Sequence, residues 1–303
     1  MGVVLSAILP VFALLLLGNV ARRTGFLQED FWREVEKGTY YILFPALLVE
    51  QLATAKMDFS TAGGLLALAV LMPLLASVLT FLFAPLLRLN AADFTSFYQG
   101  GVRFNTYIGL ALVAATLPAS ALTLAALVVG VMIPLVNVLC IGVFAYFTHG
   151  RMRLSPLLLS ILKNPLIMAC LLGMALNLLP FAVPDVALKV LEKLGQMALP
   201  LGLLAVGAGL RLQALKASGA PLFWASGVKL LLLPALMYGL CVWMQVGELE
   251  RSVLVTFAAL PTASSAYILA RQLGGNAAMM AVLITGETLF GMLTLPLVLL
   301  AVI

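Results

Sequence analysis

The residues best suited to chemistry in this chain are polar side chains within two otherwise apolar segments. The first segment spans 97–117 and the second spans 250–272. Their candidate substrate-binding residues are Arg103, Asn105, Thr106 and Tyr107 in the first and Pro261, Thr262, Ser264 and Ser265 in the second. Amide and hydroxyl groups donate hydrogen bonds to anions, and a guanidinium adds an opposite charge. We therefore expect these residues to bind a small anion.

Three ionisable side chains also fall inside apolar segments, namely Arg103, Lys229 and Glu287. A charge within a membrane is costly and is a functional candidate by default. Arg103 and Lys229 either draw anions inward or extend to the membrane interface, and for Lys229 we favour the interface. Glu287 is either a site of proton or ion coupling or the partner of one of these cations. The ion pair is the simpler interpretation.

The side chains that most enzymes require are scarce. His149 is the only histidine, and Cys140, Cys170 and Cys241 lack the spacing of metal ligands. An intramembrane hydrolase or lipid transferase needs a histidine, paired acids or a Ser–Lys or Ser–His couple. We therefore predict no catalytic residue, no metal site and no cofactor, and the protein is not expected to be an enzyme.

The elements that position these residues must be membrane-spanning helices. Apolar residues make up 63% of the 303 residues and charged residues only 10%, whereas soluble domains carry about 25% charged residues. One transmembrane helix needs about 20 apolar residues. The sequence predicts ten such spans, roughly at 3–21, 37–54, 62–86, 97–117, 120–147, 156–179, 186–210, 220–245, 250–272 and 276–302.

The placement of positive charge predicts the topology. Loops that follow odd-numbered spans hold eleven Lys and Arg residues, and loops that follow even-numbered spans hold four. Cytoplasmic loops carry the excess of positive charge, so both termini are expected outside the cell membrane (the inner membrane of a bacterium). No basic stripe with interleaved aromatic residues is present, so membrane lipids and not nucleic acid are the expected surroundings.

Proline spacing indicates an internal repeat. Four pairs lie 155 to 162 residues apart and link corresponding spans: Pro10 with Pro165, Pro45 with Pro200, Pro73 with Pro234, and Pro134 with Pro296. Five spans per repeat place the halves in opposite orientation, as in many secondary transporters. The predicted fold is all-α, with one five-helix repeat at 1–147 and its inverted copy at 156–303.

Spans 4 and 9 are expected to be broken helices. Gly100 and Gly101 loosen the first, and Pro261 removes a backbone donor from the second. Broken helices are tolerated in lipid where they line a cavity, and their N-termini would present positive dipole ends to an anion. The alternative is that these small residues serve only close helix packing.

The same residues resemble the auxin efflux carrier family. The run from Arg103 to Leu112 is similar to the Asn-Thr-Gly motif in span 4 of that family, with Tyr107 in place of its glycine. The run from Leu260 to Asn276 resembles span 9. Further similar runs are Phe44-Pro45-Ala46-Leu47-Leu48, Lys163-Asn164-Pro165 and Leu293-Thr294-Leu295-Pro296-Leu297.

The resemblance implies a fold like that of bile-acid transporters and sodium–proton antiporters. Broken helices 4 and 9 would cross, spans 1, 2, 6 and 7 would form a scaffold, and spans 3–5 and 8–10 would form a core that moves as an elevator. Asn105 and Asn164 match residues near the substrate carboxylate. A second Asn of plant members is Leu166 here, and span 4 is expected to break at Gly100–Gly101. Family members also suggest a homodimer.

We therefore predict a secondary transporter for a small organic anion, a mono- or dicarboxylate resembling malonate, malate or auxin. Two alternatives stay open. One is a sodium-coupled symporter of another small solute. The other is a non-transporting membrane scaffold or receptor, against which the polar broken helices argue because such a protein does not need them.

Overall fold

The structure is a computed structural model that describes residues 2–55, 62–149, 162–178, 183–217 and 219–302, and regular structure in these ranges is helical. The α-helices are α1 (Gly2–Arg23), α2 (Glu29–Gly38), α3 (Phe44–Ala53), α4 (Ala62–Phe83), α5 (Ala91–Val102), α6 (Thr106–Thr116), α7 (Ala119–His149), α9 (Pro165–Leu178), α10 (Asp185–Gly209), α11 (Ala220–Gly227), α12 (Leu233–Trp243), α13 (Glu248–Ala258), α14 (Ser265–Leu273) and α15 (Ala277–Val302). Short π-helical turns η1 (Thr39–Leu43) and η4 (Val228–Leu232) join α2 to α3 and α11 to α12, and the 3-10 turns are η2 (Ala84–Leu87) and η3 (Leu212–Ala217).

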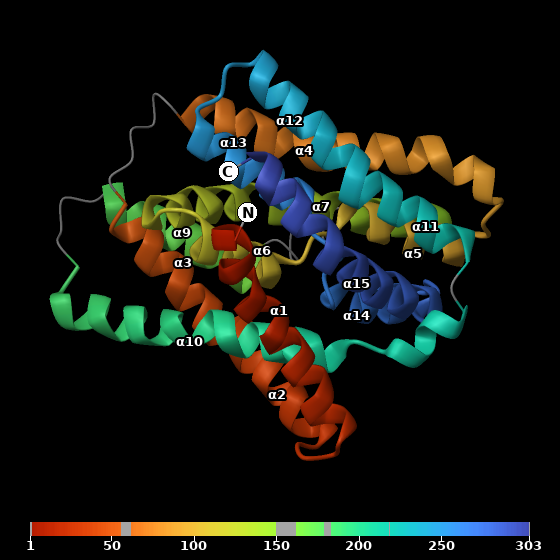
Figure 1. Cartoon of the computed structure of the whole chain (residues 1–303), viewed down its shortest axis with the longest axis horizontal. Coiled ribbons are helices and arrows are strands. Elements are labelled where there is room, and N and C mark those ends of the chain that lie inside the picture. The colour runs from red at the N-terminus through yellow and green to blue at the C-terminus, as the bar shows by residue number, and fades with distance from the viewer. Residues whose placement is uncertain (1, 56–61, 150–161, 179–182, 218, 303) are drawn as a thin grey trace.

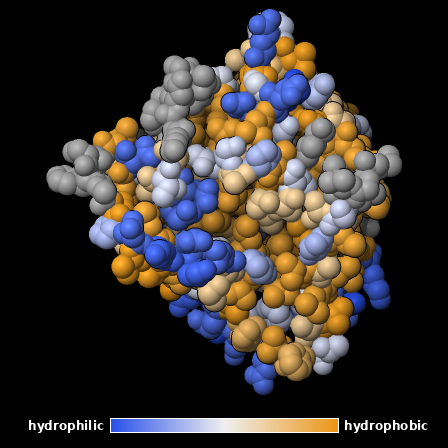
Figure 2. Space-filling view, turned by 60° about the vertical axis from the view of Figure 1, so that its left-hand side comes forward, coloured by the Kyte–Doolittle hydropathy of each residue, from blue (hydrophilic) through white to orange (hydrophobic). Residues whose placement is uncertain are grey.

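Six helices in the described ranges are long and apolar enough to cross a membrane, and they lie at 6–23, 63–87, 119–147, 185–209, 220–243 and 277–302. The predicted spans 37–54, 97–117 and 250–272 coincide with shorter or interrupted helices. The predicted span 156–179 contains α9, and its residues 156–161 and 179 lie outside the described ranges. Many large apolar side chains face outward, such as Leu9 at 68% exposure and Leu293 at 71%. Hydrophobic residues cover most of the face in Figure 2, and hydrophilic residues gather in patches. The chain is a multi-pass membrane protein.

The helices pack in two groups (Figure 1). In the first group, α10 packs along α1 and α3, and α3 packs on α9. The second group contains α4, α5, α7 and α11 to α15. Helix α6 contacts both groups.

Helices α1 and α10 approach each other at backbone distance. A Cβ atom on Gly18 would overlap the Leu204 carbonyl, and one on Gly207 would overlap the Leu15 carbonyl. Asn19 of α1 donates through Nδ2 to the Gly207 and Leu210 carbonyls, both at 3.1 Å. Small residues at a membrane helix interface permit this close approach.

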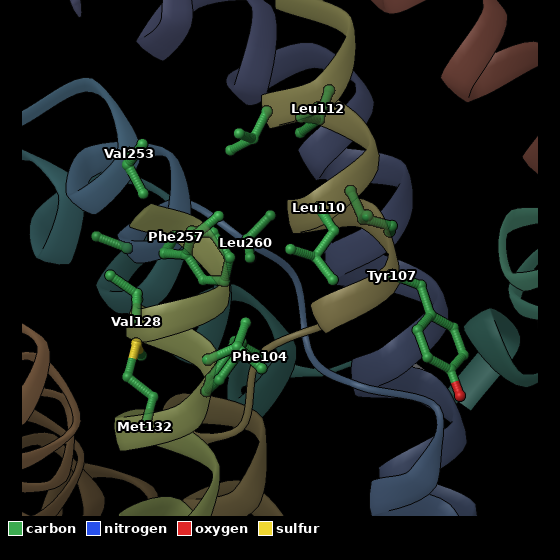
Figure 3. Packing of buried hydrophobic residues seen from close by; sticks show 14 of the residues in the cluster. Phe104, Tyr107, Leu110, Leu112, Val128, Met132, Val253, Phe257 and Leu260 are labelled. Carbon is green, nitrogen blue, oxygen red and sulfur yellow. The ribbon is translucent and has the colours of Figure 1, made fainter. Parts of the chain in front are cut away.

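Two interrupted helices meet in the middle of the molecule. Residues 103–105, between α5 and α6, are not helical, and neither are residues 259–264, between α13 and α14. The Asn105 N–H donates to the Pro261 carbonyl at 2.8 Å, which joins the two interruptions directly. Phe104 anchors the first one, because its ring packs near Met132 and Phe257 while Tyr107 points away from them (Figure 3).

The break in the first of these helices differs from the expectation. Gly100 and Gly101 are helical residues of α5, and the interruption begins at Arg103 instead. The glycines are needed for close packing: a Cβ at Gly101 would overlap the Thr80 hydroxyl, and one at Gly100 would lie 2.9 Å from Leu283. The prediction of a break at Gly100–Gly101 was therefore wrong, because small residues served packing there.

Candidate functional site

A cavity of about 580 Å³ lies beside the two interruptions. Most of the residues predicted from the sequence line it, namely Arg103, Asn105, Thr106, Tyr107, Asn164, Ser264 and Ser265. Pro261 and Thr262 do not line it. They lie behind its wall, where Pro261 accepts the hydrogen bond from Asn105.

The N-terminus of α6 faces this cavity, and Asn105 caps it. Its Oδ1 accepts hydrogen bonds from the N–H groups of Tyr107 at 3.1 Å and Ile108 at 3.2 Å. Asparagine is among the best N-cap residues because its side chain satisfies otherwise free donors of the first turn. The Nδ2 group of Asn105 is buried and has no acceptor in the described part of the protein.

Asn164 repeats this arrangement at the start of α9. Its Oδ1 accepts from the N–H groups of Leu166 at 3.0 Å and Ile167 at 3.3 Å. Pro165, the first residue of the helix, needs no acceptor. Ser264 and Ser265 place the N-terminus of α14 on the same cavity. Three helix N-termini therefore converge there, each with a positive dipole end.

Arg103 contributes a full positive charge. Its Nη1 donates to Asn137 Oδ1 at 3.3 Å and its Nη2 to Ser265 Oγ at 3.4 Å, while Nε has no acceptor. The ion pairs found among the described residues do not include it. Both contacts are long and uncharged, so the guanidinium retains the capacity to bind an anion.

Thr262 connects the second interruption to α5 and α15 through hydrogen bonds. Its hydroxyl lies 2.7 Å from the Gly100 carbonyl and 2.6 Å from Glu287 Oε2, and its N–H donates to the same Oε2 at 2.9 Å. Glu287 is fully buried at 0% exposure. This carboxyl thus lies where the two interrupted helices meet and not in the cavity.

Lys229 does not reach the membrane interface, which corrects the preferred interpretation. Its side chain is 2% exposed, and Nζ donates to the Gly101 carbonyl at 3.3 Å. It acts electrostatically on Glu287, but the two are not among the ion pairs with an N–O distance within 4.0 Å in the described ranges. Lys229 lies in the π-helical turn η4, where Val228 and Leu230 are also buried.

Comparison with known proteins shows the family of the chain. A family model described as membrane transport protein matches residues 148–299. The chain belongs to this family, that of the auxin efflux carriers. It is also 25% identical over 291 residues to a Rhizobium meliloti (strain 1021) protein named "Putative malonate transporter", with 90% of this chain and 88% of that protein covered. The protein is a membrane transporter and not an enzyme.

The cavity of this auxin efflux carrier family member contains residues that the sequence interpretation did not select. Its outer part is formed by exposed Arg33, Lys37 and Lys163, with Glu36 and the tyrosines Tyr40 and Tyr41. In the sequence, Arg33, Lys37 and Lys163 count toward the positive charge that predicts topology, and no pattern marks them as lining a cavity. Asn137 was also missed, although an amide within a predicted span is the kind of polar residue that marks a site.

Glu36 is the acidic residue among the described cavity-lining side chains. It lies just before the predicted span 37–54. Burial raises the pKa of Glu36 above its ordinary value, because the charged form loses hydration. Its charge therefore opposes the binding of an anion only above this raised pKa.

Proposed function

We propose that the protein is a secondary transporter that carries a small organic anion, a mono- or dicarboxylate such as malonate, by alternating access. The observation that carries this proposal is the convergence of three helix N-termini and the Arg103 guanidinium on one cavity. Helix N-termini are ready-made sites for anions. Discontinuous helices in transporters present such ends to substrate carboxylates.

The charges around the cavity favour the same class of substrate. Four cationic side chains line it and a single carboxylate among the described residues faces them: Arg33, Lys37, Arg103 and Lys163 against Glu36. Clefts lined by one sign of charge concentrate ligands of the opposite sign. The name of the Rhizobium meliloti relative supports malonate as the first compound to test.

The architecture that we propose has ten spans in two inverted repeats, at 1–147 and 156–303. The first packing group then provides the scaffold, from spans 1, 2, 6 and 7, and the second group provides the mobile core. The proposed mechanism is an elevator-type movement of core against scaffold. Arg33, Lys37 and Lys163 belong to the set of loops that carries most of the Lys and Arg residues, and such loops lie in the cytoplasm. In the proposed topology the cavity therefore opens toward the cytoplasm, and both termini lie outside.

A thermal-shift screen of purified protein against mono- and dicarboxylates tests the proposal. A ligand at 100 times its dissociation constant stabilises the folded state by about 2.7 kcal/mol. We expect malonate to raise the melting temperature of the wild type. An Asn105→Asp variant keeps the oxygen that caps α6 but replaces the Nδ2 donor with negative charge, so it should fold and lose this shift.

Two results would contradict the proposal. If no carboxylate shifts the wild type while cations or neutral solutes do, the anion assignment is wrong. If malonate stabilises the wild type and Asn105→Asp equally, the anion binds elsewhere. Asn137→Asp is a useful second variant, because it places the new charge beside Arg103 instead of beside the cap of α6.

A further inference from the structure

The Glu287 carboxyl lies where the two interrupted helices cross. Helix α15 carries it, and both the backbone and the hydroxyl of Thr262 contact its Oε2 atom. Thr262 directly precedes Ala263, which lines the cavity. The carboxyl is therefore buried only a short distance behind the cavity wall, yet it takes no part in the lining of the proposed anion site.

The Thr262 hydroxyl makes two short contacts with oxygen atoms but has only one hydrogen. Its hydroxyl oxygen lies 2.7 Å from the Gly100 carbonyl and 2.6 Å from Glu287 Oε2. A threonine hydroxyl has one hydrogen, and a carbonyl oxygen can only accept. If Thr262 donates to Gly100, the short contact with Oε2 needs a second hydrogen, which a protonated carboxyl supplies. An ionised carboxylate would leave one of these contacts as two oxygen atoms without a hydrogen between them.

The remaining surroundings of the carboxyl also fit the neutral form. Its Oε1 atom is buried and has no donor among the described residues, which costs much less for a neutral carboxyl than for an ionised one. Among the described parts of the elements packed against α15, which are α1, α5, α11, α13, α14, η3 and η4, only η4 presents a titratable group to Glu287, namely Lys229. Lys229 itself faces the Gly101 carbonyl and the thiol of Cys140 on α7.

We propose that Glu287 is a proton-binding site, occupied in this conformation, whose proton is exchanged during the transport cycle. On release, the proton passes to water and leaves a carboxylate. The single hydrogen of Thr262 then turns from the Gly100 carbonyl to this carboxylate, so the bond between Thr262 and Gly100 is lost, while the bond from the Asn105 N–H to the Pro261 carbonyl remains. Lys229 provides the nearby positive charge for the ionised state. Protonation thereby controls a contact that holds the crossing together.

This inference rests on the proposed function only for the link to transport, because the proton itself can be detected without any substrate. Infrared spectroscopy of the purified protein at neutral pH should show the C=O stretch of a buried, protonated carboxyl. The band should be absent in Glu287→Gln, whose neutral amide can still accept from the Thr262 N–H through its oxygen. A matched control is Glu50→Gln on α3, because Glu50 is partly buried and accepts from Gln51 far from the crossing.

Thr262→Val gives a second spectroscopic readout. The valine removes the hydroxyl that accepts from the carboxyl, so the band should persist and shift in frequency. A band that is unchanged in Glu287→Gln, or no band at all in the wild type, would show that Glu287 is ionised and would overturn the proposal.

Uptake by proteoliposomes tests the exchange of the proton. We expect an imposed proton gradient to change the rate of malonate uptake by the wild type and by Glu50→Gln but not by Glu287→Gln. Loss of gradient dependence with retained exchange of malonate supports the proposal, and retained dependence contradicts it. If no preparation transports malonate while the band behaves as expected, the proton site stands and the proposed substrate fails.

Discussion

Arg103 is the residue on which anion binding should depend most strongly. Its guanidinium has two long contacts to uncharged groups and a free Nε. Hydrogen bonds to charged groups contribute roughly 1.5–3 kcal/mol, and each 1.4 kcal/mol changes affinity about tenfold. Arg103→Gln should therefore weaken malonate binding roughly 10- to 100-fold in a calorimetric titration.

Arg103→Lys separates charge from geometry. Lysine keeps the positive charge but loses the planar pair of donors, so its affinity should fall between those of the wild type and Arg103→Gln. Equal affinity of all three proteins would show that the guanidinium only supports Asn137 and Ser265.

Glu36 should act in the opposite direction. Its carboxylate lines the same cavity as the anion, so Glu36→Gln should tighten malonate binding at neutral pH. Because burial raises the pKa of Glu36, the wild type should gain affinity as the pH falls through that pKa and the carboxyl becomes neutral. In Glu36→Gln this gain should disappear. The same titration at several pH values measures it, and weaker binding by the variant would contradict the assignment.

At the residue scale, the sequence selected more of the residues that line the inner part of the cavity than of those that line its outer part. Asn105 and Ser265 stand out because polar groups are rare in apolar spans. Glu36 and Lys163 lie at helix ends, where charged residues are ordinary, so no local pattern separates them from solvated side chains. The prediction that Lys229 reaches the interface was wrong, because its side chain is buried in the π-helical turn η4, and no rule of spacing predicts such a turn.

At the element scale, Gly101 is required in α5 by the close packing against Thr80. In Gly101→Ala, the new Cβ overlaps the Thr80 hydroxyl, and overpacking of this kind costs about 1–3 kcal/mol. We expect a lower melting temperature for Gly101→Ala. Thr80→Ala removes the overlapping atom, so the double variant should recover part of the loss. Additive destabilisation in the double variant would show that the glycine is required for another reason.

The two interruptions differ in how far sequence could predict them. Pro261 lacks an N–H and lies within 259–264, so the second interruption follows from backbone chemistry. The first begins at Arg103 and ends at the cap residue Asn105. Glycine did not predict its position, because glycines occur both within closely packed helices and at interruptions. Only contact with Thr80 and Leu283 distinguishes the two.

At the scale of the whole molecule, the two packing groups touch along α7 and α9. In the proposed elevator, α7 belongs to the core and α9 to the scaffold, so their contact must change in every cycle. A Cβ on Gly130 of α7 would lie 3.2 Å from both the Cβ and the Sγ atoms of Cys170 on α9. The usual Cβ–Cβ distance in a disulfide is about 3.8 Å, and a small shift of the helices would allow the bond.

Gly130→Cys should therefore form a disulfide with the natural Cys170 on oxidation and fasten the two groups in this conformation. We expect the oxidised protein to bind malonate, because neither residue lines the cavity, but not to move it across proteoliposomes. Reduction should restore uptake. Gly130→Ser has a side chain of similar size that cannot form the bond, so it should be insensitive to oxidant. Since α7 and α9 move relative to each other in the proposed mechanism, full uptake by the quantitatively cross-linked protein would exclude that movement.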